Sequence, residues 1–265
     1  MKHFLSYLVM VAVLCTACGK SQQELAQERL DSARTMVENN MLNSARLQID
    51  SIHLLYPKQV DIRREAAALA DTISVIEARR TIHYSDSLLQ VLRPQADKLI
   101  KQFRHEKNAL YENHGGYVHP LLATDNNTSR CLLKAIAGED GSLCVKSFYC
   151  GSSQIQHHTV TLTCGEEQVD ASGTPHCFHI ENYHEILTAD QQQSEAILTF
   201  ISANIESRIK VSLTGKSTYH YYLQDNEKKA LEQTYRLNVL IRDIRRLDEA
   251  LTKAQRLIEL KNKQS

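Results

Sequence analysis

Apolar residues recur at helical spacing near both ends of the chain. Across residues 22–112 the pattern predicts helix almost throughout, with Pro57 and Pro94 as the only breakers. A second run, residues 226–262, alternates steps of three and four without interruption, which predicts one helix about 55 Å long at 1.5 Å per residue. Its seam consists of Ala230, Gln233, Leu237, Leu240, Ile244, Leu247, Leu251, Ala254 and Ile258. A helix of this length needs another long helix to pack against.

The first helical stretch contains a turn signal at residues 39–43, where three asparagines occur. Around that turn, small and apolar residues and a terminal proline resemble a tetratricopeptide hairpin; they are Ala33, Ala45, Ile49, Ile52 and Pro57. The resemblance covers one repeat of about 34 residues, whereas an open array needs about three. We therefore expect one helical hairpin that packs on the next helix.

That next helix carries a narrow apolar seam formed by Ile62, Ala66, Leu69, Ile73 and Ile76. The prediction is that Pro94 ends this helix and that a further helical segment, with Ala96, Leu99 and Phe103, runs on to about residue 112. Such a seam is typical of a helix that packs along another helix. We expect the C-terminal helix to be the partner, in an antiparallel stalk.

The middle of the chain has a different composition, with most of the glycines, five cysteines and eight of the twelve histidines between residues 114 and 220. Short β-branched or aromatic runs predict six strands, at residues 132–137, 143–149, 155–163, 177–181, 208–213 and 218–223. Residues 138–141 resemble a hairpin turn, and residues 189–207 predict one helix packed on the sheet. This pattern indicates a β-rich domain.

Together these patterns predict an α+β fold, in which a long antiparallel, coiled-coil-like helical stalk carries an inserted small, mostly antiparallel β domain with one helix. The expected boundaries are a leader at 1–17, an N-terminal helical arm at 18–112, a β-rich domain at 113–224 and a C-terminal helix at 225–265.

The start of the chain carries a targeting signal. Lys2 and His3 precede an apolar run at residues 4–14, which is too short to span a membrane of about 30 Å as a helix. The small residues that follow, together with Cys18, resemble the lipobox of bacterial lipoproteins. This resemblance implies a signal peptide cleaved before Cys18, acyl chains on Cys18 and attachment to a membrane. We expect the outer membrane, on its periplasmic side.

Two further resemblances point to the same kind of cell. The segment 210–216 and the tyrosines that follow it are similar to the C-terminal sequence of uncharacterised lipoproteins from Bacteroidetes-type bacteria. An Asp-Ser/Thr-apolar pattern resembles the O-glycosylation signal of Bacteroidetes envelope proteins, and it occurs at Ser32, Ser51, Thr72 and Ser87. Ordinary amphipathic helices also generate this pattern, so both interpretations stay open.

Histidines and cysteines are the candidate ligands in the β-rich domain. Imidazole and thiolate groups bind zinc and copper, and His157, His176 and His179 are the residues that we consider for such a site. The cysteines of this region lack the paired spacing that is typical of a structural zinc site. A half-buried sheet with polar histidines on its surface is therefore the simpler interpretation of these residues. Five further cysteines either form one or two disulfides or stay as buried free thiols, and Cys144 and Cys150 could share one face of a strand; the five are Cys131, Cys144, Cys150, Cys164 and Cys177.

Charge and motifs restrict the function. The 31 Lys and Arg residues balance 31 Asp and Glu residues, which excludes a polybasic nucleic-acid binder. No nucleophile elbow, phosphate loop or dinucleotide glycine series occurs. The sequence therefore favours a non-enzymatic scaffold without a cofactor, which binds another envelope protein. The alternative is a periplasmic protein that binds a metal or a small ligand. The long seam of the C-terminal helix is compatible both with pairing inside one chain and with self-association of two chains.

Overall fold

The computed structural model describes residues 20–107, 114–123 and 129–264. The lipobox and Cys18 lie outside these residues. The fold is mixed α+β, with helices at both ends of the chain and strands between them. Two compact units are present: Met1–Tyr84 with Leu251–Ser265, and Ser85–Ala250. Among the described helices, none is both long and apolar enough to cross a membrane.

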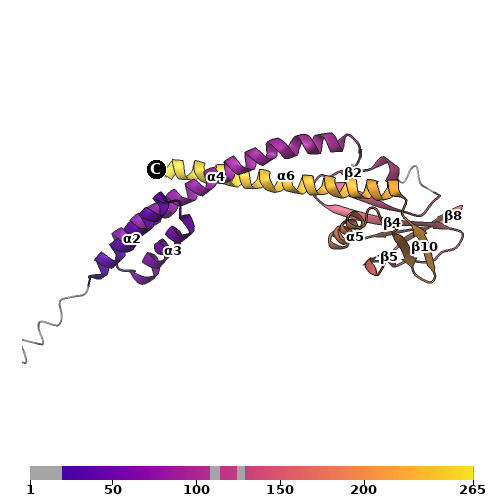
Figure 1. The fold of residues 1–265 in the computed structure, drawn as a ribbon, viewed down its shortest axis with the longest axis horizontal. Coiled ribbons are helices and arrows are strands. Elements are labelled where there is room, and N and C mark those ends of the chain that lie inside the picture. The colour runs from indigo at the N-terminus through magenta and orange to yellow at the C-terminus, as the bar shows by residue number, and fades with distance from the viewer. Residues whose placement is uncertain (1–19, 108–113, 124–128, 265) are drawn as a thin grey trace, which may run out of the picture. The chain divides into compact units, whose positions relative to one another are not determined.

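The first unit contains a helical hairpin, α2 (Gln22–Glu38) and α3 (Leu42–Leu55), as the sequence predicts. The hydroxyl of Ser21 accepts the backbone N–H of Glu24, and the Glu24 carboxylate accepts the N–H of Ser21, so a capping box starts α2. Pro57 follows the end of α3. In Figure 1 the hairpin lies beside the first half of the long helix α4 (Val60–Ile100).

The apolar seam of α4 has a different partner from the one predicted. Ile62, Ala66 and Ile73 are buried in one cluster with Ala26, Leu30, Ala33, Leu42, Ala45, Ile49 and Ile52 of the hairpin. The C-terminal helix α6 (Asp225–Gln264) approaches this part of α4 through an ion pair, 2.7 Å between Lys261 Nζ and Asp71. The short hairpin helices need an apolar surface to cover, and the seam supplies it.

Pro94 does not end the helix, contrary to the sequence-based prediction. Helix α4 continues through it to Ile100, with Leu89 and Ala96 buried on either side. A proline removes one backbone donor and clashes with the preceding turn. Burial of apolar side chains before and after Pro94 holds the helix together across this defect.

The predicted helix between Ile100 and residue 112 is also wrong in part. The chain leaves α4 at Ile100 and forms the strand β1 (Arg104–Glu106). Phe103 packs with Leu99 and Ile100 against Leu237 and Ile241 of α6, so the helix pairing predicted from the seam exists here. Pairing of β1 with a neighbouring strand overrides the local helical pattern. The last part of this predicted helix, residues 108–112, lies outside the described residues.

The second unit contains two antiparallel sheets. The strands are β2 (Gly116–Val118), β3 (Leu132–Gly138), β4 (Leu143–Gly151), β5 (Thr159–Cys164), β6 (Glu167–Ser172), β7 (His176–Ile180), β8 (Asn182–Thr188), β9 (Lys210–Thr214) and β10 (Thr218–Tyr222). The six-stranded sheet has the order β1-β2-β3-β4-β8-β7, and the four-stranded sheet has the order β10-β9-β5-β6. All six predicted strands exist, and β1, β2, β6 and β8 were missed.

One apolar core lies between these sheets and two helices. Alternate residues of β3 and β4, such as Leu133 and Val145, meet Val160 and Leu162 of β5. Helix α5 (Gln191–Ala203) closes this core with Ile197, Leu198 and Ile201, and the start of α6 adds Ala230 and Leu231. The predicted internal helix is therefore present and packs on the sheets.

The turn between β3 and β4 is fixed by helix α6. Gly141 has a φ of 85°, a region that favours glycine. The side-chain amide of Asn238 donates to the carbonyl oxygens of Gly141 and Ser142 at 3.0 and 2.8 Å. Asn238 is fully buried, so these bonds hold the hairpin at a defined place on the helix.

Candidate functional site

The three histidines considered for a metal do not come together. His157 precedes β5, a strand of the four-stranded sheet, and is completely buried. His176 and His179 lie on β7, in the other sheet, and are exposed. Within the described part of the chain, no group of three or more histidine, cysteine or acidic residues is placed to hold a metal ion.

The five described cysteines carry free thiols. Cys144 and Cys150 do share one face of β4, but six residues at about 3.3 Å each separate them by about 20 Å. A disulfide needs Cα atoms closer than about 7 Å. The Cys131 thiol hydrogen-bonds to the backbone of Cys150: it accepts the Cys150 N–H at 3.4 Å and donates to the Cys150 carbonyl oxygen at 3.5 Å. Cys131 packs on the core, whereas Cys150 lines a surface pocket.

His157 instead belongs to a buried polar network with two residues that sequence analysis did not single out. Its Nδ1 is 2.8 Å from a carboxylate oxygen of Glu185, and its Nε2 is 2.9 Å from the hydroxyl of Ser147. Ser147 lies on β4 and Glu185 on β8, both of the six-stranded sheet. The network therefore links this sheet to the segment that leads into β5.

Glu185 receives most of the hydrogen bonds in this network. Its carboxylate accepts the backbone N–H groups of Ile155, Gln156 and His157 at 2.7, 2.6 and 2.7 Å. Burial acts to raise the pKa of Glu185, but the hydrogen bonds from His157, Gln156 and Ile155 outweigh burial and hold the pKa below its usual 4.5. The side chain is thus an ionised acceptor at neutral pH.

The ionised carboxylate determines the tautomer of the imidazole. Burial lowers the pKa of His157 below its usual 6.5, more than the Glu185 carboxylate raises it, so the ring is neutral at pH 7. A carboxylate has no proton to donate, so Nδ1 carries the hydrogen toward Glu185. Nε2 then accepts a hydrogen bond from the hydroxyl of Ser147.

Serine, histidine and glutamate in this order have the connectivity of a hydrolytic triad. Ser147 is 2% exposed, however, and both His157 and Glu185 are 0% exposed. Ser147 sits in the middle of β4, where β3 and β8 flank it, with Leu133 and Leu187 directly opposite. No substrate reaches this hydroxyl in the folded state, and we interpret the network as a structural link between the sheets.

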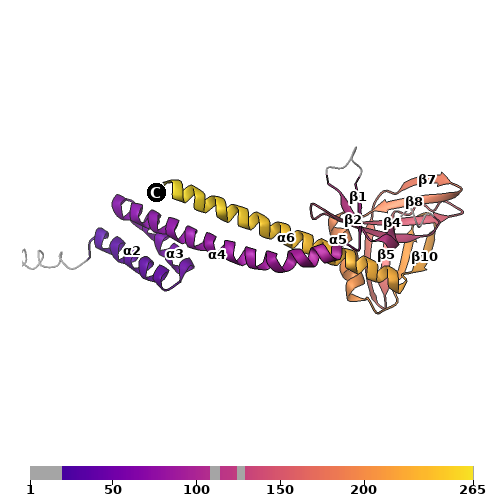
Figure 2. The ribbon, with the colours of Figure 1, turned by 90° about the horizontal axis from the view of Figure 1, so that it is seen from above.

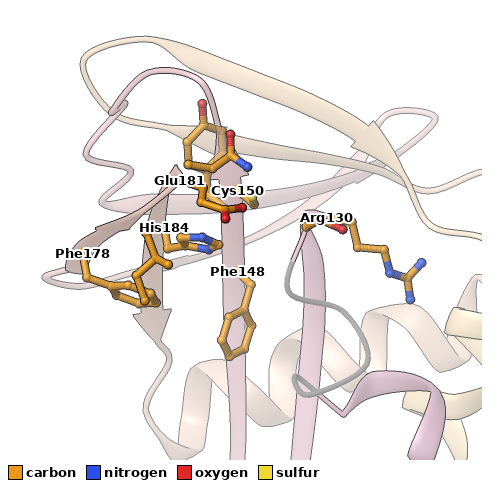
Figure 3. A pocket seen from close by; sticks show the side chains of 10 residues that line it. Arg130, Phe148, Cys150, Phe178, Glu181 and His184 are labelled. Atoms are coloured by element: carbon orange, nitrogen blue, oxygen red, sulfur yellow. The ribbon is translucent and has the colours of Figure 1, made fainter.

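A surface pocket of about 400 Å³ lies elsewhere in this unit, at the β7–β8 hairpin. We call it the β7 pocket and define it by Phe148, Cys150, Phe178, Ile180, Glu181 and His184; Ser129, Arg130, Tyr149 and Asn182 complete its lining. Figure 3 shows Phe178 and His184 from the hairpin and Phe148 and Cys150 from β4 around one space. Sequence analysis missed this pocket.

The register of the strands explains how these side chains meet. Cys150 pairs with His184, and His184 pairs with Phe178, so all three share one face of the sheet. The rings of Phe178 and His184 stack, with centroids 4.9 Å apart and planes 8° from parallel. Phe178 remains 37% exposed and Ile180 66% exposed. The pocket is therefore aromatic and opens at the edge strand β7, which Figure 2 shows next to β8.

Charged groups lie at the border of the β7 pocket. The guanidinium of Arg130 forms an ion pair of 2.8 Å with Glu227, which is buried at the start of α6. In Figure 3 the Arg130 side chain extends away from the aromatic residues. Glu181 is exposed between β7 and β8, with a φ of 58°. The carboxylate of Glu181 is thus the charge that the pocket offers to a ligand.

The four residues with an O-glycosylation pattern all lie in helices. Ser32 is in α2, Ser51 in α3, and Thr72 and Ser87 in α4. The hydroxyls of Ser51 and Thr72 donate to the carbonyl oxygens of Leu47 and Ala68, one turn earlier. Thr72 and Ser87 are exposed, whereas Ser32 and Ser51 are half-buried. Glycosylation of these residues stays a prediction.

Comparison with known proteins gives no relative from which a function can be transferred: no family model, curated protein or solved structure matches this chain significantly.

The buried network predicts acid sensitivity of the folded state. Because the folded pKa of His157 is lowered, protonation in the unfolded chain reduces stability as the pH falls below about 6.5. Glu185, whose folded pKa is also lowered, contributes stability above about pH 4.5 that is lost on further acidification. Urea unfolding followed by tyrosine circular dichroism measures both effects.

We expect the free energy of unfolding to fall by up to about 1.4 kcal/mol per pH unit from His157 alone between pH 6.5 and its folded pKa. His157→Gln removes this contribution, whereas His179→Gln, which changes an exposed histidine of β7 that does not act on His157, retains it. Equal pH slopes for wild type and His157→Gln would contradict the assignment.

Burial of Ser147 predicts that it does not react as a nucleophile. A fluorophosphonate probe should leave the folded protein unlabelled, because the hydroxyl is 2% exposed. Intact-protein mass spectrometry measures the label, with Ser147→Ala as the matched control. Labelling that Ser147→Ala abolishes would show that the network is an active site.

Proposed function

We propose that this protein is a non-enzymatic, lipid-anchored protein of the bacterial cell envelope that binds another envelope protein through its β-rich unit. The observation that carries the proposal is the β7 pocket, an aromatic pocket at a sheet edge beside the exposed side chains of Phe178 and Ile180. Exposed apolar groups with a polar border are typical of protein-binding surfaces. The anchor would be Cys18, at the outer membrane facing the periplasm.

Two features favour binding over catalysis. The constellation with catalytic connectivity, Ser147 with His157 and Glu185, is sealed inside the core. In the β7 pocket, burial raises the pKa of the Cys150 thiol, so this thiol is protonated at neutral pH and a weak nucleophile. The accessible part of the β7 pocket is thus an apolar, aromatic surface with the exposed Glu181 carboxylate at its border.

A small ligand is the second candidate, since the β7 pocket has a volume within the range of small-molecule sites. Ile180 favours a protein, because this lining residue is 66% exposed and a protein surface covers more of its side chain than a small molecule in the pocket does.

Site-specific photocrosslinking in the producing cell tests the partner. With a photoreactive amino acid in place of Ile180, we expect a reproducible crosslink to one envelope protein, because Ile180 lies at the mouth of the β7 pocket. Adding Phe178→Lys should reduce the crosslink at least about 10-fold, since a charge is costly in an apolar contact. Mass spectrometry identifies the linked protein.

The matched control is a photoreactive residue in place of Leu54, an exposed leucine of α3. Crosslinks of the same pattern from both positions, or self-links alone, would contradict the proposal. The purified partner should then bind wild type and Leu54→Lys equally and Ile180→Lys much more weakly. Specific binding of a small metabolite, with no crosslinked protein, would favour the second candidate.

The lipid anchor has its own test. Cells that are fed an alkyne-labelled palmitate should attach it to the wild-type protein, because a lipobox cysteine becomes acylated after signal cleavage. Cys18→Ser should abolish the label and leave the uncleaved chain, whereas Cys15→Ser should retain it. An unlabelled wild-type protein in the soluble fraction would exclude the anchor.

A further inference from the structure

We infer that the β7 pocket binds an extended segment of its partner, which adds as a strand to the free edge of β7 and places a large apolar side chain against Phe178 and Ile180 at the mouth of the pocket. This inference rests on the proposed partner binding and specifies the kind of segment that is bound. Its basis is the chemistry of the edge strand, the direction of its side chains and the charge at the pocket.

Strand β7 has an unpaired edge. In the described part of the chain, it pairs with β8 on one side and with no strand on the other. Its free backbone groups are therefore a template for another strand. Five residues at about 3.3 Å each offer a pairing length of about 16 Å.

The composition of β7 lacks the usual protection against such pairing. Edge strands commonly carry charged residues, especially lysine, that keep other strands away. The edge strands β1 and β6 fit this rule with Arg104, Glu106, Glu167 and Asp170. The fourth edge strand, β10, also lacks these charged residues, although a charged group, the guanidinium of Arg208, lies over its Tyr222 ring, 3.7 Å from the ring centroid. Strand β7 contains no Lys, Arg, Asp or Glu.

Side-chain direction connects this edge to the pocket. His176, Phe178 and Ile180 alternate along β7 and share the face on which His184 and Cys150 lie. A strand added beside β7, about 4.8 Å away, presents every second side chain on this same face. Phe178 and Ile180 are the lining residues of the pocket nearest to this edge, and a large side chain such as Trp, Tyr, Phe, Leu or Met covers more of their exposed surface than Ala or Val does.

The stacked rings of Phe178 and His184 favour an aromatic side chain, which can contact them in an offset or edge-to-face geometry. Glu181 adds a charge preference. Because Arg130 is engaged with Glu227, the exposed carboxylate of Glu181 selects a lysine or arginine near the apolar residue and disfavours an acidic one. The expected ligand is thus an extended, neutral-to-basic segment with one large aromatic or aliphatic anchor.

The test uses the purified full chain in detergent and a phage-displayed library of random nonapeptides. We expect enriched peptides to combine strand-forming residues with one large apolar anchor and an adjacent Lys or Arg. Replacing the anchor by Ala should weaken binding about 10-fold or more, as measured by fluorescence polarisation of the synthetic peptide. Glu181→Gln should weaken peptides with Lys or Arg and leave neutral peptides unchanged.

Backbone N-methylation separates strand addition from other binding modes. In an added strand only alternate N–H groups bond to the edge, so methylation at every second position should abolish binding and methylation between them should not. Phe178→Lys and Ile180→Lys should each abolish binding while retaining the wild-type unfolding midpoint, and Leu54→Lys should have no effect.

The inference would be overturned by peptides that bind equally well whichever set of alternate N–H groups is methylated. It would also be overturned by peptides that bind Phe178→Lys and Ile180→Lys as tightly as the wild-type protein. If no peptide is enriched although a photoreactive residue at Ile180 still captures a partner, strand addition is wrong and the proposed partner binding stands. If neither occurs, both fail.

Discussion

The carboxylate of Glu185 organises the interior of the β-rich unit. It accepts three successive backbone N–H groups from residues 155–157 and the imidazole N–H of His157, so one side chain on β8 positions the segment that leads into the second sheet. Unpaired backbone donors in this core would cost about 1–3 kcal/mol each. These hydrogen bonds thus position the segment directly before β5, the strand that pairs with β6 and β9.

The buried network also assigns the two faces of the six-stranded sheet to different roles. Ser147 and Glu185 point into the core, where they are sealed by apolar neighbours, and the residues that alternate with them point outward. Phe148 and His184 are the immediate neighbours of Ser147 and Glu185 along their strands, and both line the β7 pocket. The same alternation that hides the polar network therefore forms the accessible aromatic surface on which the proposed partner binding rests.

The helices pack on their neighbours mainly through long stretches of apolar contacts and through few polar contacts. Helix α4 covers the α2–α3 hairpin in the first unit, and its last turns meet Leu237 and Ile241 of α6 in the second. Arg93 and Asp248 form an ion pair of 2.6 Å between the same two helices, at an exposed position where such pairs contribute less than about 1 kcal/mol. The apolar contacts, and the bonds of Asn238 to the β3–β4 turn, specify how α6 packs on the second unit.

Local patterns in the sequence determined much of this architecture. Spacings of three and four predicted the hairpin helices, α4 up to Pro94 and α6, and β-branched runs predicted six of the strands, because burial of one face imposes its period on the chain. The α+β class follows from the order of these patterns. Strand β8 escaped prediction because its central Glu185 is a buried acceptor, and a charged residue in a strand pattern indicates exposure until its partners are known.

Only the tertiary structure decided which residues meet. The sequence placed His157 with His176 and His179 as possible metal ligands, but strand order puts them in different sheets and gives His157 to Glu185 and Ser147. The β7 pocket joins Phe148, Phe178 and His184 from three strands, and its existence depends on register, which no local pattern contains. The local conformational preferences of the chain determine where helices and strands form. Which strands lie next to each other depends on pairing between residues far apart in the sequence, and the residues of a binding site are brought together by that pairing.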